Sequence, residues 1–300
     1  MNNISTKIKD LRLFVQNHVR GSAIGDGVVD FFNMVGVNDH LTKILYTQDQ
    51  KNPTKGMQYA IKFFNSHQKE IEAVTNLLAD QQSKEVYQAA IRYRQTHDWN
   101  DAPVYSKHDQ YFVKDIVPIT DQEIFVDCGA FDGDTMEEFF KVCNNQFRRV
   151  ICFEPMLEYY QKIEKRSDGK NVIPIRAGVY KETTILHFNA DGKGSAITMK
   201  NDENTISVPV CAIDDTPECQ DATFIKMDVE GSELDALIGA KETILRNRPK
   251  LAICIYHRHR DFIDIPNWIH TLVPDYKLYI RHHSFSVNET VLYAIPEEKA

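Results

Sequence analysis

The chain has 300 residues, of which 42% are hydrophobic and 26% are charged, a composition that is ordinary for a globular protein with a substantial core. Its formal charge of −8 is uneven: residues 1–120 hold 14 basic and 13 acidic side chains, whereas residues 121–300 hold 21 and 30. The acidic second part argues against a nucleic-acid partner, because such binding depends on clustered Lys and Arg.

No segment of the sequence is typical of a membrane-bound or exported protein. The longest aliphatic run, Leu251–Tyr256, is far shorter than the roughly 20 residues that a membrane-spanning helix needs. No positively flanked apolar segment opens the chain, so no signal peptide is expected. The six cysteines form no CxxC pair and several lie in apolar runs. We therefore expect reduced structural thiols in a cytoplasmic protein.

Residues 1–100 are predicted to form a helical accessory domain. Apolar residues recur at helical spacing between Met57 and Arg94, and four glycines divide an earlier, shorter helical pair. Residues 101–120, which contain Pro103 and Pro118, are the predicted linker. Three roles are open for the helical region: it covers a cleft of the second domain, binds an acceptor, or joins two copies into a homodimer.

From Glu123 the pattern changes to short apolar runs that alternate with helical segments, and residues 121–300 are predicted to form a second domain. The expected strands are Ile124–Cys128, Val150–Phe153, Asn171–Arg176, Thr223–Met227, Leu251–Tyr256, Lys277–Ile280 and Thr290–Ile295. The expected helices are Thr135–Phe147, Met156–Lys165, Ser232–Arg246 and Asp261–Leu272. This alternation is typical of an α/β fold with a doubly wound, mainly parallel sheet. Two-residue alternation between Thr183 and Asp214 predicts an inserted β-hairpin.

The segment that ends the first expected strand reads Asp127-Cys128-Gly129-Ala130-Phe131-Asp132-Gly133-Asp134-Thr135. Ligands of open α/β sheets bind at the carboxyl ends of strands, and the two glycines allow a tight turn and a close backbone approach. The spacing is not the G-x-G-x-x-G of dinucleotide sites, and three carboxylates would repel a pyrophosphate. They suit a cationic ligand that carries an amino group and a sulfonium. Thr135, with Glu138 three residues later, fits a capping box.

The second expected strand ends at Phe153-Glu154-Pro155. Glu154 follows Gly133 by 21 positions, which is the spacing at which an acidic residue at the end of a second strand binds ribose hydroxyls. A carboxylate accepts one hydrogen bond from each hydroxyl of a cis diol. An exposed Glu that merely ends a strand is the alternative.

The fourth expected strand runs into Lys226-Met227-Asp228-Val229-Glu230-Gly231-Ser232-Glu233. Alternation places Lys226, Asp228 and Glu230 on one side of the extended run. Carboxylates in a cleft are costly unless they bind or deprotonate something. We expect Ser232 to cap the next helix, and Glu233 to act as a first-turn acid that complements the helix dipole rather than as a catalytic group.

The fifth expected strand ends at Tyr256-His257, and the usual order of such sheets would bring His257 next to Asp228. Histidine is the natural general base near neutral pH, although a structural histidine is an equal alternative. Further along the chain, His282, His283 and Glu289 could join Asp228 and Glu230 in a metal site. No tight ligand spacing supports this arrangement, so no metal is predicted.

Together these motifs resemble the FkbM family of S-adenosylmethionine-dependent methyltransferases. The resemblance covers about residues 111–296 and rests on Asp127–Gly133, Phe153-Glu154-Pro155, Ala177-Gly178-Val179, Gly194-Ser195, Ile225–Glu233 and Tyr256-His257. Lys226–Glu233 is its most specific part. Phe131 departs from the broader methyltransferase pattern, which has glycine at that position in many members.

The resemblance implies a Rossmann-like, seven-stranded methyltransferase sheet with an antiparallel last strand, S-adenosyl-L-methionine as cofactor, and a hydroxyl of a sugar, glycan or secondary metabolite as methyl acceptor. The residues expected to bind the cofactor are Asp127, Gly129, Ala130, Phe131, Gly133, Asp134, Thr135, Glu154, Ala177 and Asp228. Among them Glu154 would hold the ribose, and residues near Ala177 would hold the adenine. We expect His257 to be the base, with Asp228 or Glu230 orienting it or the acceptor.

Two other functions are open at this point. A non-catalytic module that binds S-adenosylmethionine or only keeps the methyltransferase fold would look similar, although the intact set of Asp127, Glu154 and Asp228 argues against a decayed site. A nicotinamide-dependent oxidoreductase is disfavoured because the G-x-G-x-x-G motif is missing.

Overall fold

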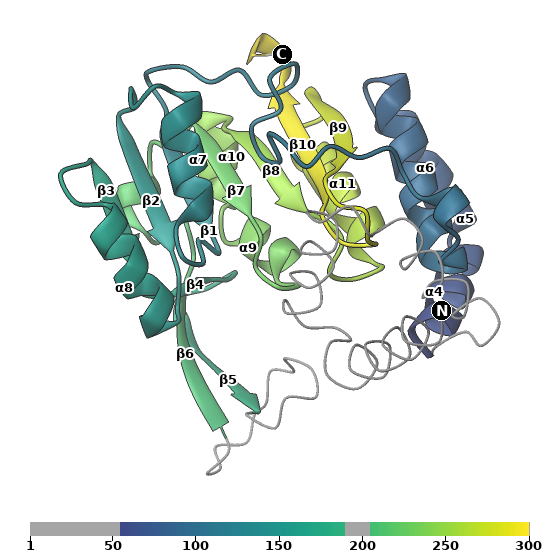
Figure 1. Ribbon diagram of the computed structural model, residues 1–300, viewed down its shortest axis with the longest axis horizontal. Coiled ribbons are helices and arrows are strands. Elements are labelled where there is room, and N and C mark those ends of the chain that lie inside the picture. The colour runs from purple at the N-terminus through teal and green to yellow at the C-terminus, as the bar shows by residue number, and fades with distance from the viewer. Residues whose placement is uncertain (1–54, 190–204, 300) are drawn as a thin grey trace, which may run out of the picture.

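The structure, a computed structural model, describes residues 55–189 and 205–299. The predicted helical pair in residues 1–54 and the Gly194-Ser195 motif therefore lie outside the described residues. The central sheet contains seven strands: β1 (Ile124–Cys128), β2 (Arg149–Phe153), β3 (Val172–Ile175), β7 (Phe224–Met227), β8 (Lys250–Cys254), β9 (Tyr276–His282) and β10 (Thr290–Pro296). Their order is β3-β2-β1-β7-β8-β10-β9 (Figure 1).

The direction of these strands matches the sequence prediction. β1 pairs in parallel with β2 and β7, and the parallel pairing continues to β3 on one side and β8 on the other. β10, the last strand, is antiparallel to both β8 and β9. The doubly wound sheet with its antiparallel last strand is thus confirmed, and each predicted strand ends within two residues of the observed one.

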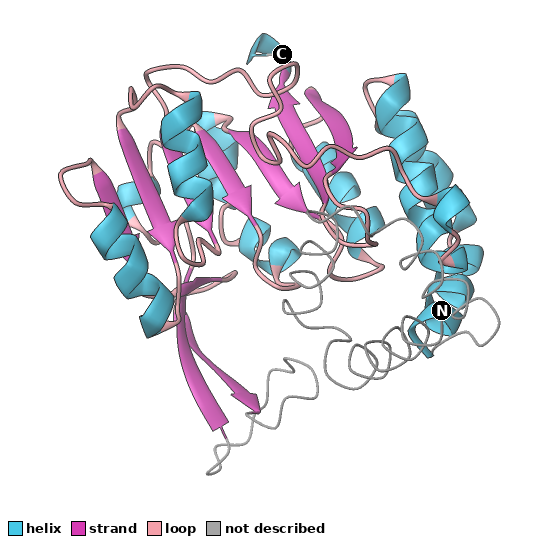
Figure 2. Ribbon diagram, in the orientation of Figure 1, coloured by secondary structure: helices cyan, strands magenta, loops and turns pink. Residues whose placement is uncertain are grey.

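Helices cover both faces of the sheet (Figure 2). One face carries α7 (Asp134–Val142) and α8 (Leu157–Arg166), and the other carries α9 (Glu233–Ile238), α10 (Lys241–Asn247) and α11 (Asp261–Leu272). Alternation along β1 supplies both layers, because Phe125 packs with Phe139 of α7 while Val126 belongs to the core on the other face, which includes Leu237 of α9. Three short 3₁₀ helices are also present: Trp99–Asp101, Pro217–Cys219 and Glu297–Lys299.

Two predicted helices were too long, for local reasons. The expected helix Thr135–Phe147 ends at Val142, because Asn144 and Asn145 adopt the left-handed conformation with φ of 52° and 56°. The expected helix Ser232–Arg246 is divided into α9 and α10 at Gly239. A Cβ at Gly239 would lie 2.2 Å from the carbonyl oxygen of Tyr180, so the packed backbone there leaves no room for a side chain.

The described N-terminal helices α4 (Lys55–Ser66), α5 (Gln68–Leu77) and α6 (Gln81–Thr96) cover the end of the sheet beside β9 (Figure 1). Ser83 of α6 accepts a hydrogen bond from the backbone N–H of Ile280 at 2.9 Å, and Tyr87 donates to the carbonyl of Phe262 at 2.9 Å. These helices share one hydrophobic core with the sheet. The domain boundary near residue 100 and a homodimer through this region stay predictions.

A buried arginine links this helical layer to two loops. Arg94 of α6 is 6% exposed, and its Nη2 donates to the carbonyl oxygens of Tyr256 at 2.8 Å and Val287 at 2.5 Å. Tyr256 follows β8, and Val287 lies between β9 and β10. One side chain of the helical layer therefore fixes the spacing of two loops at the carboxyl edge of β8.

The predicted β-hairpin is confirmed as part of a second, smaller sheet. This sheet has the order β4-β6-β5 and consists of β4 (Gly178–Val179), β5 (Thr184–Asn189) and β6 (Thr205–Cys211). β5 and β6 are antiparallel and project from the main sheet (Figure 1). All six cysteines are free thiols, and five of them are buried. Within the described ranges no helix is both long and apolar enough to cross a bilayer.

Candidate active site

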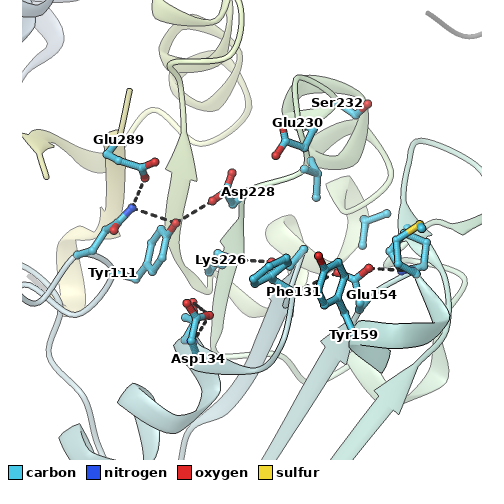
Figure 3. Close-up of a pocket in the computed structure, with 18 of the residues that line it drawn as sticks. Tyr111, Phe131, Asp134, Glu154, Tyr159, Lys226, Asp228, Glu230, Ser232 and Glu289 are labelled. Carbon is cyan, nitrogen blue, oxygen red and sulfur yellow. Dashed lines mark hydrogen bonds between the residues drawn. The ribbon is translucent and has the colours of Figure 1, made fainter. Parts of the chain in front are cut away.

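A cleft of about 910 Å³ opens where the parallel strands of the main sheet end. Its lining comes from the loops after β1, β2, β7 and β9, from the small sheet, and from the segment before β1. Figure 3 shows two ends with different chemistry. We call the group Phe131, Glu154, Met156 and Tyr159 the aromatic end, and the group Gln110, Tyr111, Asp228 and Glu289 the acidic end.

The loop between β1 and α7 depends on two glycines. Gly129 has a φ of 79°, and a Cβ there would lie 1.9 Å from the carbonyl oxygen of Asp228. Only glycine therefore allows this loop to touch the loop that follows β7. Gly133, with a φ of 87°, occupies the N-cap position of α7. The predicted capping box of Thr135 is wrong, because the helix has already begun at Asp134, whose carboxylate accepts the N–H of Thr135 at 2.7 Å.

A buried ion pair lies directly beneath this loop. Asp127 and Lys226, with side chains 0% and 2% exposed, approach to 3.0 Å. Lys226 Nζ also donates to the carbonyl of Gly129 at 2.8 Å. Burial opposes the charge of Lys226, but the carboxylates of Asp127 and Asp228 raise its pKa above the ordinary value. Apart from Lys226, no described residue donates a hydrogen bond to either oxygen of Asp127, so this carboxylate depends on the lysine alone.

At the aromatic end, Glu154 is held by the backbone. Its two oxygens accept the N–H of Phe131 at 3.0 Å and the N–H of Met156 at 2.8 Å. The residue is 6% exposed, and burial raises the pKa of its carboxyl group above the ordinary value. The alternative of an exposed Glu at a strand end is therefore wrong. Each oxygen retains a second acceptor direction, which fits a pair of hydroxyl donors from the cleft.

At the acidic end, a chain of hydrogen bonds connects two carboxylates (Figure 3). Asp228 accepts the hydroxyls of Tyr111 at 3.0 Å and Tyr256 at 3.3 Å. Gln110 donates to the Tyr111 oxygen at 3.1 Å and to Glu289 at 2.5 Å. Burial, reinforced by the nearby charge of Asp228, raises the pKa of Glu289 to about 7. The chain holds both carboxylates at fixed positions along one wall.

His257 lies beside Asp228, as the sequence led us to expect, but it stands behind the cleft wall. Its Nε2 is 3.5 Å from Asp228 Oδ1 and 3.6 Å from Glu230 Oε2, and both of its ring nitrogens are buried. Its Nδ1 is 2.8 Å from Glu233 Oε1. Burial disfavours a charged ring, yet Glu233, Asp228 and Glu230 together raise the pKa of His257 to about 9. The ring is therefore a cation at neutral pH, and its role as the base stays a prediction.

The role of Glu233 differs from that of a first-turn acid, which its position in the sequence indicated. It begins α9, but its side chain is fully buried and turns toward His257. The same oxygen accepts the N–H groups of Val229 at 2.9 Å and Gly231 at 3.3 Å. Ser232 occupies the N-cap position of α9, as expected, but in the described part of the chain its side chain makes no capping bond. Glu233 instead supports the turn and orients the ring.

The two histidines considered for a metal site, His282 and His283, make hydrogen bonds to other groups of the protein. His282 contacts Thr290 Oγ1 at 2.9 Å and the carbonyl of Ser286 at 2.8 Å. Likewise His283 contacts the carbonyl of Ser106 and the hydroxyl of Tyr293, both at 2.8 Å. Burial lowers the pKa of each ring to about 4, so both are neutral. Possible ligand atoms of Asp228, Glu233 and His257 do lie within 4.8 Å of one another, and the ion pairs of an imidazolium account for that arrangement.

The cleft gathers most of the residues expected to bind a cofactor. Its lining includes Gly129, Phe131, Asp134, Thr135, Glu154 and Asp228, together with Glu230. In the described part of the chain, the lining does not include Asp127, Ala130, Gly133 or Ala177. Asp127 is sealed beneath the loop by Lys226, and Ala130 and Ala177 pack in the core. Glu289, considered in the sequence only for a metal site, also lines it. Gln110, Tyr111 and Tyr159 line it without having been foreseen, and only the aromatic character of Tyr111 and Tyr159 could have marked them.

Comparison with known proteins identifies the family. The model of the methyltransferase FkbM domain matches residues 127–287. The solved structure of methyltransferase FkbM from Methylobacillus flagellatus KT is similar, with a TM-score of 0.67 and 28% identity. That match covers 78% of this chain but 60% of the other, so the chain spans about three fifths of that protein's length.

A putative rRNA-methylase from Clostridium thermocellum is more distant, with a TM-score of 0.40 and 11% identity over 65% of this chain and 98% of that one. No protein of curated function matches the sequence. Because the FkbM domain model accounts for more than half of its length, the chain belongs to the FkbM methyltransferase family.

Proposed function

We propose that the protein transfers a methyl group from S-adenosylmethionine to a hydroxyl oxygen of a small-molecule or glycan acceptor. One arrangement carries the proposal: Glu154, after β2, and Asp228, after β7, line the same cleft at the carboxyl edge of a doubly wound sheet. Ligands of such sheets bind at that edge. The family membership supplies the reaction class, and the two carboxylates supply contacts for its two substrates.

The residues of the cleft fit the cofactor. Glu154 offers one free acceptor direction on each oxygen, as a ribose diol requires. Asp134, Glu138, Asp228 and Glu230 add negative charge around the same space, which favours a sulfonium cation and would repel a dinucleotide pyrophosphate. When bound, the cofactor supplies an electrophilic methyl group on a positively charged sulfur.

Asp228 is the group that we place against the acceptor hydroxyl. It lines the cleft, and its carboxylate is fixed by Tyr111 and Tyr256. The hydroxyl becomes strongly acidic as its oxygen forms the new bond, so a nearby carboxylate can take the proton before it passes to solvent. Holding the two substrates in line contributes up to about 7–11 kcal/mol toward lowering the barrier.

His257 then serves as a positioning residue. Its ring is buried behind Asp228 and Glu230, and Glu233 keeps it protonated at neutral pH, so it has no free lone pair for the acceptor. A fixed cation 3.5 Å from Asp228 holds that carboxylate in place. This assignment differs from the base expected at the sequence level, and the pH dependence of turnover distinguishes the two.

Titration calorimetry with S-adenosylhomocysteine and with NAD⁺ tests the cofactor, and transfer of labelled methyl to a panel of sugars, glycans and hydroxylated metabolites tests the reaction. We expect binding of S-adenosylhomocysteine but not of NAD⁺, and label on oxygen. Asp228→Asn should retain cofactor binding and lose at least about 100-fold in turnover. Binding without transfer to any hydroxyl would favour a non-catalytic module, and tight NAD⁺ binding would overturn the proposal.

A further inference from the structure

Phe131 has a backbone conformation that is unusual for its residue type. Its φ is 47°, in the left-handed region where a bulky side chain is a rare outlier. The side chain is also 49% exposed and lines the cleft, so it gains little from burial. Strain of this kind persists where the surroundings enforce it, and it concentrates at functional sites. The hydrogen bond from the Phe131 N–H to Glu154 at 3.0 Å is one such constraint.

The Phe131 ring is supported from one side. The ring of Tyr159, in the first turn of α8, lies 4.1 Å from it between centroids, with the planes inclined by 42°. Lys162 Nζ lies 4.8 Å from the centre of the Tyr159 ring. Figure 3 shows the two rings side by side next to Glu154. The α8 side chains therefore back a ring whose exposed part belongs to the cleft.

We propose that Phe131, backed by Tyr159, is a stacking subsite for the purine base of the cofactor. This inference rests on the proposed function, because it needs Glu154 to hold the ribose. The Phe131 backbone is hydrogen-bonded to that carboxylate, so a ribose held by Glu154 would bring the attached base close to the Phe131 ring. An aromatic face binds any purine by stacking and needs no hydrogen-bond partner.

The subsite adds an aromatic surface to the region that the resemblance assigns to the adenine. Ala177 itself is 6% exposed and outside the cleft lining, but the residues that follow it, Gly178, Val179 and Tyr180, line the cleft. The acidic end offers charged groups that suit a cation rather than a neutral base. Met156, which is 52% exposed, lines the cleft beside Phe131 and Tyr159 and extends the apolar surface. The strained backbone at Phe131 thus turns an aromatic face toward the ligand.

The test measures binding of S-adenosylhomocysteine, S-adenosylmethionine and adenosine to the full chain by calorimetry. Phe131→Leu keeps apolar bulk but removes the aromatic face, and Phe131→Gly removes the side chain while suiting the positive φ. Leu157→Ala is the matched control, because Leu157 is 46% exposed and lies outside the cleft lining. Thermal unfolding of each variant shows whether a loss of binding comes from a loss of folding.

We expect both Phe131 variants to bind all three ligands about tenfold more weakly, because stacking acts on the base that the ligands share. Phe131→Gly should unfold at the wild-type temperature or above, and Leu157→Ala should bind like the wild type. Wild-type affinity for adenosine in Phe131→Leu would overturn the subsite, as would a loss confined to S-adenosylmethionine, which would place the ring at the sulfonium. If the unaltered chain binds none of the ligands, the proposed function itself fails.

Discussion

Two buried lysine–carboxylate pairs lie at opposite edges of the same sheet, and they differ in what surrounds them. Lys226 pairs with Asp127 at the carboxyl edge beneath the cleft, and Lys250 pairs with Glu123 at the amino edge. All four side chains are 4% exposed or less. Their residue types and burial are alike, so any difference in role must come from their remaining contacts.

The amino-edge pair is saturated by the protein. Glu123 accepts the N–H and hydroxyl of Thr120 at 3.1 and 3.2 Å and the hydroxyl of Thr223 at 2.5 Å, while Lys250 donates to the carbonyl of Pro118 at 2.6 Å. At the carboxyl edge, no described residue other than Lys226 donates a hydrogen bond to Asp127, and Lys226 also holds the carbonyl of Gly129 in the loop between β1 and α7. The amino-edge pair, whose groups are all bonded within the protein, stabilises the sheet. The carboxyl-edge pair instead positions the loop that lines the cleft.

Lys226→Met should have the largest effect of the changes considered. Removing the cation leaves Asp127 buried without its partner, which should lower the free energy of unfolding by about 3–5 kcal/mol. Binding of S-adenosylhomocysteine should also be lost, because the Gly129 loop loses its anchor. Denaturant unfolding and calorimetry measure the two effects. Lys250→Met is the matched variant: it should cost similar stability through Glu123 but preserve binding. Equal loss of binding in both variants would refute the distinction between the two edges.

Glu154→Gln extends the contrast to a carboxylate that lines the cleft rather than the core. The amide can accept only on one side, so it should weaken binding of S-adenosylhomocysteine by about 10- to 100-fold, as expected for lost charge-assisted bonds of about 1.5–3 kcal/mol. Since burial raises the pKa of Glu154, wild-type binding should also weaken as the pH falls through that raised value. Calorimetry across pH checks both, and an unchanged affinity in Glu154→Gln would remove Glu154 from the site.

The pH dependence of turnover separates the two roles for His257. If its cation holds Asp228, turnover should be level near neutral pH and fall about tenfold per pH unit above about 9. If His257 is the base, turnover should instead rise up to about pH 9. Glu233→Gln removes a group that raises this pKa, so it should move the transition to lower pH in either case.

The same pKa makes a stability prediction with a defined sign. The ring is protonated more readily in the folded than in the unfolded chain, so its contribution to folding is complete below pH 6.5 and disappears as the pH rises through about 9. Unfolding free energies measured from pH 6 to 10 should show this decline. His257→Gln should remove it, and a decline that persists in His257→Gln would assign it to another group.

Ser232→Ala should have the smallest effect. A genuine N-cap typically contributes about 0.5–2 kcal/mol, but the Ser232 side chain makes no capping bond in the described residues. We therefore expect the free energy of unfolding to change by less than about 0.5 kcal/mol. Denaturant unfolding measures it directly. A loss above about 1 kcal/mol would mean that the turn after β7 depends on its serine as well as on Glu233.

The sequence predicted what depends on local pattern. Apolar runs gave the seven strands, and the residues that follow β1, β2 and β7 gave the position of the cleft. Helix ends were less accurate, because they depend on single residues such as Asn144 in a left-handed conformation and on the close backbone contact at Gly239. Those features follow from tertiary packing, which the periodicity of apolar residues in the sequence does not predict.

Side-chain partners were the least predictable part of the site. Gln110 and Tyr111 lie in what the sequence presented as a linker, yet they reach Asp228 and Glu289 across more than one hundred residues of chain. Glu233 sits where an acid normally complements a helix dipole, and only the folded loop shows that it meets His257. The sequence predicted Asp127 to be a cofactor-binding residue, whereas in the fold its ion pair with Lys226 holds it beneath the cleft.

The hydrogen bonds of Arg94 have a consequence for the order in which parts of the protein unfold. This side chain of α6 ties down the loops that carry Tyr256 and Val287, which flank Asp228 and Glu289, whereas Glu154 is held by its own neighbours. Partial opening of the helical layer would therefore release the acidic end of the cleft and leave the aromatic end intact. On heating, turnover should fail before binding of S-adenosylhomocysteine does, so heat inactivation would begin in the helices beside β9 rather than at the glycine loop.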